Sequence, residues 1–244
     1  MNIDMKREIR ETVRLNHFLS QAGVCSRREA DRLIGSGRVQ VNGERAEVGM
    51  LVRQEDRVQV DGREIEISSR KTVFLAVNKP RGVVVTSDRR WGDLLLQDIV
   101  DYPLRVFPIG RLDKDSEGLI LMTDDGEAAN RIQKAREYHE KEYLVEVDKK
   151  VTDRFLLDLQ AGVWLEDLKV RTRECRAVRT GDRAFDIVLT QGLNRQIRRM
   201  CAAFGYQVVR LKRIRVMNVM LGDLKPGQYR ELTEREEKEL RAQL

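Results

Sequence analysis

The stretch between Gly110 and Gly118 holds the residues best suited to chemistry, because it carries the charged side chains Arg111, Asp113, Lys114, Asp115 and Glu117. A carboxylate set between cations stays ionised, and in that state it can act as a nucleophile or as a base. Asp113 has this setting, with Arg111 two positions before it and Lys114 directly after it. One interpretation of the stretch is therefore a catalytic loop built around Asp113.

Two other interpretations compete with this one. A calcium-binding loop has ligands at fixed spacings, and these spacings are matched by Asp113, Asp115, Glu117, Gly118 and Asp124. Such a loop requires a helix on each side, whereas Pro108 and the apolar run after Gly118 favour strands, so we predict no metal site. The simplest alternative is a solvated turn between strands, whose charges only keep it in water.

Short apolar runs flank the charged stretch and must position it. Val106–Ile109 precedes it and Leu119–Thr123 follows it, and both are typical of buried strands. A polar loop held between two buried strands is a usual place for a catalytic group. Further along, residues 126–136 have the apolar spacing of a helix, and residues 141–147 are typical of a strand.

A second polar motif, residues 190–200, combines a predicted strand end, a glycine turn and a basic helix that ends near Gly205. The segment from Gln191 to Val216 contains no Asp or Glu, and its cations are Arg195, Arg198, Arg199, Arg210, Lys212, Arg213 and Arg215. A uniformly basic segment is typical of a surface that faces phosphate. Taken alone, the motif would favour a solvated basic helix.

The sequence Gly-Arg-Leu-Asp-Lys-Asp-Ser-Glu-Gly-Leu at residues 110–119 resembles the signature of the RNA pseudouridine synthases. The resemblance extends from Arg14 to Leu232 and includes residues 78–82, 139–143 and 191–200. It lies in the branch that contains the A-type synthase of the small ribosomal subunit and the B-, E- and F-type synthases of the large one. The sub-motifs look most like the F type.

The resemblance implies roles for four residues. Asp113 would be the catalytic carboxylate, and Arg111 would occupy the space left by the flipped-out base. Tyr143 would stack on that base and help to remove the proton from uracil carbon 5, although a lone strand tyrosine is more often a core residue. Arg198 would pair with Asp113, keeping it ionised and correctly aimed. RNA phosphates would be met by Arg195, Arg199, Lys212 and Arg213.

The implied reaction is isomerisation of a specific uridine to pseudouridine in structured RNA, and it requires no metal or redox cofactor. The expected substrate is 23S ribosomal RNA, with a tRNA anticodon stem-loop as a candidate second substrate. Specificity for 16S ribosomal RNA is the alternative within the enzyme class. A non-catalytic RNA-binding or ribosome-assembly factor is the alternative from another class.

The sequence of residues 14–68 predicts a compact N-terminal unit. Two helices, the first closed by Gly23 and the second begun at Ser26, are followed by short strands that turn at Asn42-Gly43 and Asp61-Gly62. These residues resemble the S4 RNA-binding module. Its phosphate contacts would then come from Arg14, Arg27, Arg28, Arg32 and Arg38.

Composition agrees with an RNA partner. The 244 residues are 41% hydrophobic, which suffices for real cores, and the net charge of +6 with a pI near 9.3 favours an anionic partner. Three distant cysteines and two histidines support neither a disulfide framework nor a zinc site. Without a membrane-length apolar run or a signal-peptide core, we expect a soluble, cytoplasmic monomer.

We predict an α+β protein with five parts. An N-terminal extension (1–13) precedes the S4 module (14–68) and a linker (69–72). The catalytic domain (73–232) is expected to be a large mixed, mainly antiparallel sheet with flanking helices. A charged helix (233–244) follows.

Overall fold

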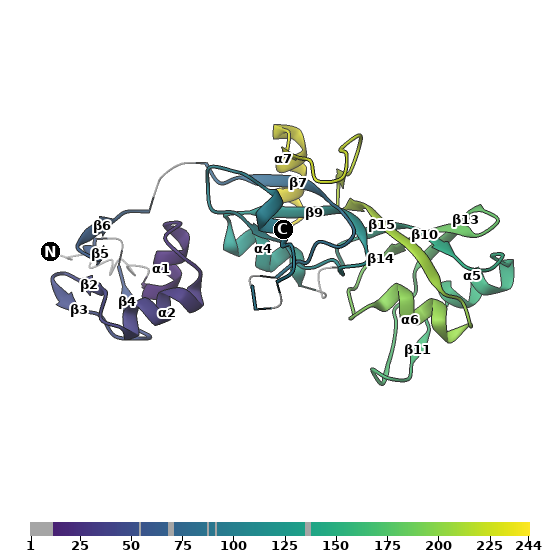
Figure 1. The fold of residues 1–244 in the computed structure, drawn as a ribbon, viewed down its shortest axis with the longest axis horizontal. Coiled ribbons are helices and arrows are strands. Elements are labelled where there is room, and N and C mark those ends of the chain that lie inside the picture. Colours follow the sequence, from purple (N-terminus) through teal and green to yellow (C-terminus); the bar gives the residue numbers. More distant parts are fainter. Residues whose placement is uncertain (1–11, 54, 68–70, 87, 91, 135–137) are drawn as a thin grey trace, which may run out of the picture. The chain divides into compact units, whose positions relative to one another are not determined.

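The computed structural model describes residues 12–53, 55–67, 71–86, 88–90, 92–134 and 138–244. The predicted N-terminal extension up to residue 11 and residues 69–70 of the predicted linker lie outside the described residues. By its contacts the chain divides into two compact units, Met1–Lys71 and Thr72–Leu244 (Figure 1).

The first unit joins two helices to short antiparallel strands. After β1 (Val13–Arg14) come α1 (Leu15–Gln21) and α2 (Arg27–Gly35), and the strands are β2 (Val39–Val41), β3 (Glu44–Arg45), β4 (Leu51–Val52), β5 (Val58–Val60) and β6 (Arg63–Ile65). The sheet order is β3-β2-β5-β6, while β1 pairs with β4. Ser26 caps α2 by accepting a hydrogen bond from the Glu29 amide at 3.2 Å. The helix pair and turns are those that the sequence predicts.

The hairpin turns of this unit depend on residues that tolerate positive φ. Asn42 and Gly43 have φ of 54° and 85°, and Asp61 and Gly62 have φ of 51° and 77°. Two successive residues with positive φ form the turn whose twist matches antiparallel strands. The turns set the register of β2 on β5, in which Val39 faces Val60 and Val41 faces Val58. These buried valines pack on Leu15, Leu19, Ala30 and Ile34 from the helices.

The second unit is built on a nine-stranded sheet of order β13-β14-β10-β15-β9-β7-β17, with β16 beside β15 and β8 beside β9. Its strands are β7 (Phe74–Lys79), β8 (Phe107–Pro108), β9 (Glu117–Thr123), β10 (Lys141–Val147), β13 (Arg176–Gly181), β14 (Ala184–Leu189), β15 (Val208–Val216), β16 (Val219–Met220) and β17 (Tyr229–Glu231). A separate pair joins β11 (Trp164–Leu165) to β12 (Val170–Arg171). Only β9 and β15 run parallel among the described strand pairs of the nine-stranded sheet. The predicted α+β class and mixed, mainly antiparallel sheet are confirmed.

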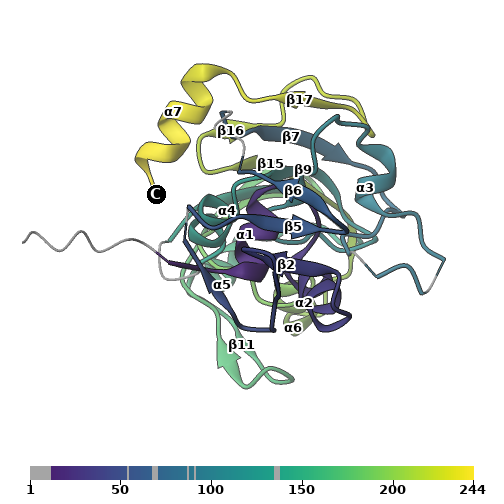
Figure 2. The ribbon, with the colours of Figure 1, turned by 90° about the vertical axis from the view of Figure 1, so that its left-hand side faces the viewer.

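Helices cover both faces of the sheet around β7 and β9 (Figures 1 and 2). The helices are α3 (Leu96–Ile99), α4 (Gly126–Gln133), α5 (Asp153–Gln160), α6 (Gln196–Ala203) and α7 (Glu234–Ala242). One core contains residues of α3, α5 and α6, and the other contains residues of α4 and α7. Every residue of β7 is therefore buried, which explains the apolar run from Phe74 to Val77. The capping box at Thr233 and Glu236 starts α7.

No helix among the described residues is both long and apolar enough to cross a membrane.

Candidate active site

The charged loop joins β8 to β9, so strands flank it where a calcium site would need helices. The Ile109 amide donates to the Leu121 carbonyl at 2.7 Å at its base, and the Ser116 amide donates to the Asp113 carbonyl at 3.1 Å across its tip. These bonds hold residues 113–116 in a tight turn. Ser116 is fully buried, whereas the Asp113 side chain remains 32% exposed. Asp113 is thus fixed by its backbone and open to a ligand.

Residues 79–82 brace the loop from one side. The Gly82 amide donates to the Lys114 carbonyl at 2.7 Å. The buried Lys79 ammonium donates to the carbonyls of Pro80 and Val83, both at 2.8 Å. Burial lowers the pKa of Lys79 to about 8, although the carboxylates of Asp115, Asp113 and Glu117 oppose this shift. A cation therefore sits beneath the acidic loop without reaching its surface.

The parallel pairing of β9 with β15 brings the loop to the second polar motif. Gly118 faces Arg213 in this register and has a φ of 105°. A Cβ atom on residue 118 would lie 2.7 Å from the Arg213 backbone nitrogen and closer still to its carbonyl. The close approach of the two backbones requires glycine at this position.

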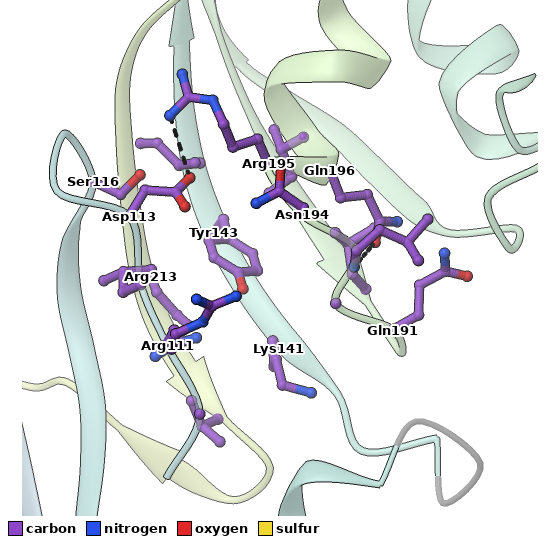
Figure 3. A pocket seen from close by; sticks show the side chains of 18 of the residues that line it. Arg111, Asp113, Ser116, Lys141, Tyr143, Gln191, Asn194, Arg195, Gln196 and Arg213 are labelled. Atoms are coloured by element: carbon purple, nitrogen blue, oxygen red, sulfur yellow. Dashed lines mark hydrogen bonds and ion pairs between the residues drawn. The ribbon is translucent and has the colours of Figure 1, made fainter. Parts of the chain in front are cut away.

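A pocket of about 330 Å³ opens between the loop, the middle of the sheet and the segment before α6 (Figure 3). In Figure 3 Asp113 lies on one side of it, Gln191 and Asn194 lie on the other, and Tyr143 stands between them. Residues from distant parts of the chain therefore face one cavity. Among the predicted site residues, the pocket is lined by Arg111, Asp113, Tyr143, Arg195 and Arg213.

Tyr143 and Arg213 are buried together at the centre of the pocket. Tyr143 is 9% exposed, and the guanidinium carbon of Arg213 lies 6.0 Å from the centre of its ring. Arg213 is 4% exposed and donates from Nε to the Leu119 carbonyl at 2.6 Å. The β15 register turns the Arg213 side chain inward to the pocket and away from the outer surface, so its expected contact with RNA stays a prediction. Tyr143 belongs both to the core and to the pocket lining.

The predicted pairing of Arg198 with Asp113 is not the contact that the structure shows. Arg195 forms the ion pair with Asp113 at 3.8 Å and also contacts Asp115 at 3.2 Å. Arg198 instead contacts the Asp115 carboxylate at 3.3 Å, and its guanidinium donates to the Val208 carbonyl at 3.0 Å and the Asp115 carbonyl at 3.2 Å. The reason is geometric: Arg195 precedes α6 with a φ of 50°, which places it over the loop, whereas Arg198 lies one turn further inside.

These two guanidiniums control the charge on Asp115. Burial raises its pKa, but the hydrogen bond from Arg195 and the charges of Arg198 and Arg195 hold the pKa below the ordinary value. Burial lowers the pKa of Arg198, against the influence of Asp115. The Nε of Arg198 is buried without a hydrogen-bond partner among the described residues. Arg198 thus acts as a clamp on the turn that carries Asp113.

The rest of the basic segment is largely neutralised by neighbouring carboxylates. Arg210 contacts Glu117 at 2.5 Å and Arg215 contacts Glu142 at 2.7 Å. The predicted phosphate ligand Arg199 forms an ion pair with Asp167. Lys212 is half-buried on β15. The number of arginines and lysines in residues 191–216 therefore overstates the unpaired positive charge that the folded segment presents. The carboxylates that pair with them come from strands and loops elsewhere in the chain.

Lys141 is a pocket residue that the sequence did not single out. It shares a face of β10 with Tyr143, and its ammonium donates to the His139 carbonyl at 3.2 Å. Burial, together with the charge of Arg213, lowers the pKa of Lys141 to about 8. The signal available in the sequence was the two-residue spacing from Tyr143, because alternate residues of a strand point the same way.

Comparison with known proteins identifies the family of the chain that contains this pocket. The family model for RNA pseudouridylate synthase matches residues 73–203, a span that contains the loop, β10 and α6. The chain belongs to the RNA pseudouridine synthases. The S4 domain model matches residues 13–58, which lie in the first unit.

The chain is similar to known pseudouridine synthases over most of its length. It is 49% identical over 226 residues to the dual-specificity RNA pseudouridine synthase RluF of Escherichia coli O6:H1, covering 92% of this chain and 77% of that one. It is 35% identical to the ribosomal large subunit pseudouridine synthase B of Bacillus subtilis, covering 94% and 96% of the two chains. A crystal structure of a pseudouridylate synthase superposes with a TM-score of 0.70 at 30% identity, covering 93% and 99%.

The arginines expected to bind RNA in the S4 domain differ in their surroundings. Arg14, Arg27 and Arg28 are exposed. Arg32 forms an ion pair with Glu29 at 2.7 Å, and Arg38 forms one with Asp61 at 2.5 Å. Both of these pairs are exposed, so they can exchange a carboxylate for a phosphate at little energetic cost.

Proposed function

We propose that the synthase isomerises a specific uridine of 23S ribosomal RNA in the cytoplasm, with Asp113 as the catalytic carboxylate. A tRNA anticodon stem-loop is the second substrate in this proposal. The observation that carries it is the position of Asp113, held by a clamped turn at the edge of a pocket large enough for a flipped pyrimidine base. Support for the substrates comes from the relatives, one named as dual-specificity and one named for the large ribosomal subunit.

The reaction breaks the bond between uracil N1 and ribose C1′ and forms a bond between uracil C5 and C1′. A proton leaves C5 and a proton is taken up at N1, so substrate and product have the same composition. The base must first leave its stack, which costs roughly a few kcal/mol and less for a loop or bulge nucleotide. The pocket has to hold the detached ring while it turns.

Each pocket group has a part in this proposal. Arg111, exposed on the loop, fills the space that the base leaves in the RNA. Tyr143 stacks on the base and takes part in removing the C5 proton. Arg195 and Arg198 keep the carboxylates of the loop ionised and in place. The Lys141 ammonium donates to an oxygen of the flipped nucleotide, because only one acceptor for it, the His139 carbonyl, is present among the described contacts.

Pseudouridine mapping in cells tests this proposal. Ribosomal RNA and tRNA from cells lacking the gene are compared with RNA from cells that carry the wild type or Asp113→Asn. We expect one large-subunit uridine and one tRNA uridine to regain the modification with the wild type only. The asparagine variant should lose at least about 10³-fold in turnover while still binding RNA, because the amide keeps the shape but not the charge.

The outcome of the mapping separates the alternatives. A site restored by Asp113→Asn would exclude Asp113 as the catalytic group. A restored site in 16S ribosomal RNA would overturn the proposed substrate and leave the chemistry intact.

A further inference from the structure

Tyr138 lies three residues before the pocket residue Lys141 and has two unusual properties. Its backbone has a φ of 56°, a conformation that bulky residues adopt only at a cost of about 1–2 kcal/mol. Tyr138 is also 61% exposed, whereas tyrosine is usually at least half-buried. The chain runs from Tyr138 through the buried His139 to Lys141, which lines the pocket. A strained backbone therefore holds an aromatic ring outward beside the site.

Arg173 supports this ring from one side. Its guanidinium carbon lies 4.0 Å from the centre of the Tyr138 ring, which is the distance of a stacked cation–π pair. The guanidinium also donates to the Thr190 carbonyl at 3.1 Å, and the Arg173 amide donates to the Gln191 side chain at 2.8 Å. Gln191 is itself a wall of the pocket. The stacked pair is thus tied to the catalytic pocket through residues 190 and 191.

Because Tyr138 is 61% exposed, much of its surface away from Arg173 is available to a ligand. A ring with one face on a guanidinium and the other in water is a platform on which an unpaired base can stack. When the target uridine flips out, the neighbouring bases lose a stacking partner. An aromatic ring beside the pocket would replace part of the lost stacking energy.

We propose that Tyr138, supported by Arg173, is a stacking subsite for the base of a nucleotide next to the target uridine. The ligand is an unpaired base of RNA, so the inference rests on the proposed function. Because stacking accepts any base, the subsite contributes affinity and positions the RNA backbone without reading sequence.

The test compares Tyr138→Ala with Tyr138→Trp in the full chain. Trp164→Ala is the matched control, since Trp164 is a 50% exposed aromatic residue on the separate β11–β12 pair and has no described contact with Arg173 or Gln191. The probe is an RNA stem-loop carrying the uridine identified by mapping, and its affinity is measured by fluorescence anisotropy with Asp113→Asn in the background. We expect Tyr138→Ala to weaken binding roughly tenfold, and Tyr138→Trp and Trp164→Ala to bind as the parent does.

A second measurement reports on stacking directly. The nucleotides on each side of the target uridine are replaced in turn by 2-aminopurine, whose fluorescence falls when it stacks. We expect protein to quench one of the two positions, and Tyr138→Ala but not Trp164→Ala to remove that quenching. Equal affinity and equal quenching with and without Tyr138→Ala, when Tyr138→Ala alone with Asp113 intact still modifies the stem-loop, would overturn the subsite. Failure of the wild type to modify any RNA would instead overturn the proposed function.

Discussion

Two arginines near the start of α6 contact the loop that carries Asp113, and they do so in different ways. Arg195 is 44% exposed and pairs with Asp113 and Asp115 through side chains alone. Arg198 is 13% exposed and reaches two backbone carbonyls as well as the Asp115 carboxylate. Several donors in one plane can be supplied by a guanidinium but not by an ammonium.

Lysine substitutions should therefore separate the two arginines. Arg195→Lys keeps a cation beside Asp113, and we expect it to retain kcat within about tenfold. Arg198→Lys cannot bridge residues 115 and 208, so the turn shifts and kcat should fall by about 10²-fold, as for a misplacement near 1 Å. Single-turnover kinetics on the mapped stem-loop measure both. Equal losses in the two variants would contradict the clamp.

The pocket ammonium of Lys141 should limit activity at alkaline pH. Its pKa is lowered to about 8, so the proton is lost as the pH rises through that value. We expect kcat/KM of the wild type to fall above about pH 8, and the fall to disappear in Lys141→Arg, because an arginine stays protonated there. The pH profile of single-turnover rates is the measurement. A fall that persists in Lys141→Arg would assign it to another group, for which Lys79 is the candidate since its pKa is also about 8.

Among the elements, β9 and β15 matter most because their parallel pairing joins the two polar motifs. Residues 118 and 213 are far apart in the chain, yet their backbones meet so closely that no side chain fits on Gly118. The strands supply the geometry of the site: β9 begins directly after the loop, and β15 follows α6.

Substitution of Gly118 tests this element pair. Gly118→Ala forces β9 away from β15, and we expect it to lower the free energy of unfolding by about 3 kcal/mol or more and to abolish activity. Gly222→Ala is the control, because Gly222 also has a positive φ, 57°, but a Cβ there would meet nothing within 4 Å. Chemical denaturation of both variants gives the comparison. Similar losses would show that backbone strain alone, and not the close approach, makes glycine necessary.

At the scale of the whole molecule, each hydrophobic core formed by the described residues belongs to one unit. Among these residues, one core uses the first unit only, and the two cores around the large sheet use the second unit only. A unit that buries its own core can fold alone. The two tasks of the chain, holding RNA and modifying it, are therefore carried by units with separate cores.

Removal of residues 1–71 should accordingly leave a folded catalytic unit. We expect the remaining chain to unfold cooperatively, and its affinity for the stem-loop to fall at physiological salt because the arginines of the S4 domain are lost. Circular dichroism during thermal unfolding and binding measured at several salt concentrations check both parts, with a shallower salt dependence expected for the shortened chain. Loss of all cooperative unfolding would show that the boundary is wrong.

Much of this protein could be predicted because its signals are local. The caps of α2 and α7, the Asn42-Gly43 and Asp61-Gly62 turns and the strands around residues 110–118 depend on near neighbours in the chain, so residue types alone indicate them. The family signature placed Asp113 on the loop between those strands.

Tertiary structure decided which charges meet. The sequence showed a segment free of carboxylates from Gln191 to Val216, but Glu117, Glu142 and Asp167 come from other elements to pair with its arginines. Arg195 rather than Arg198 reaches Asp113, Arg213 turns inward, and Lys141 enters the pocket. Each of these outcomes depends on strand register and on the direction in which a helix enters the site. The physical reason is that such long-range pairing is set by how the whole sheet packs, which the order of residues in one segment does not contain.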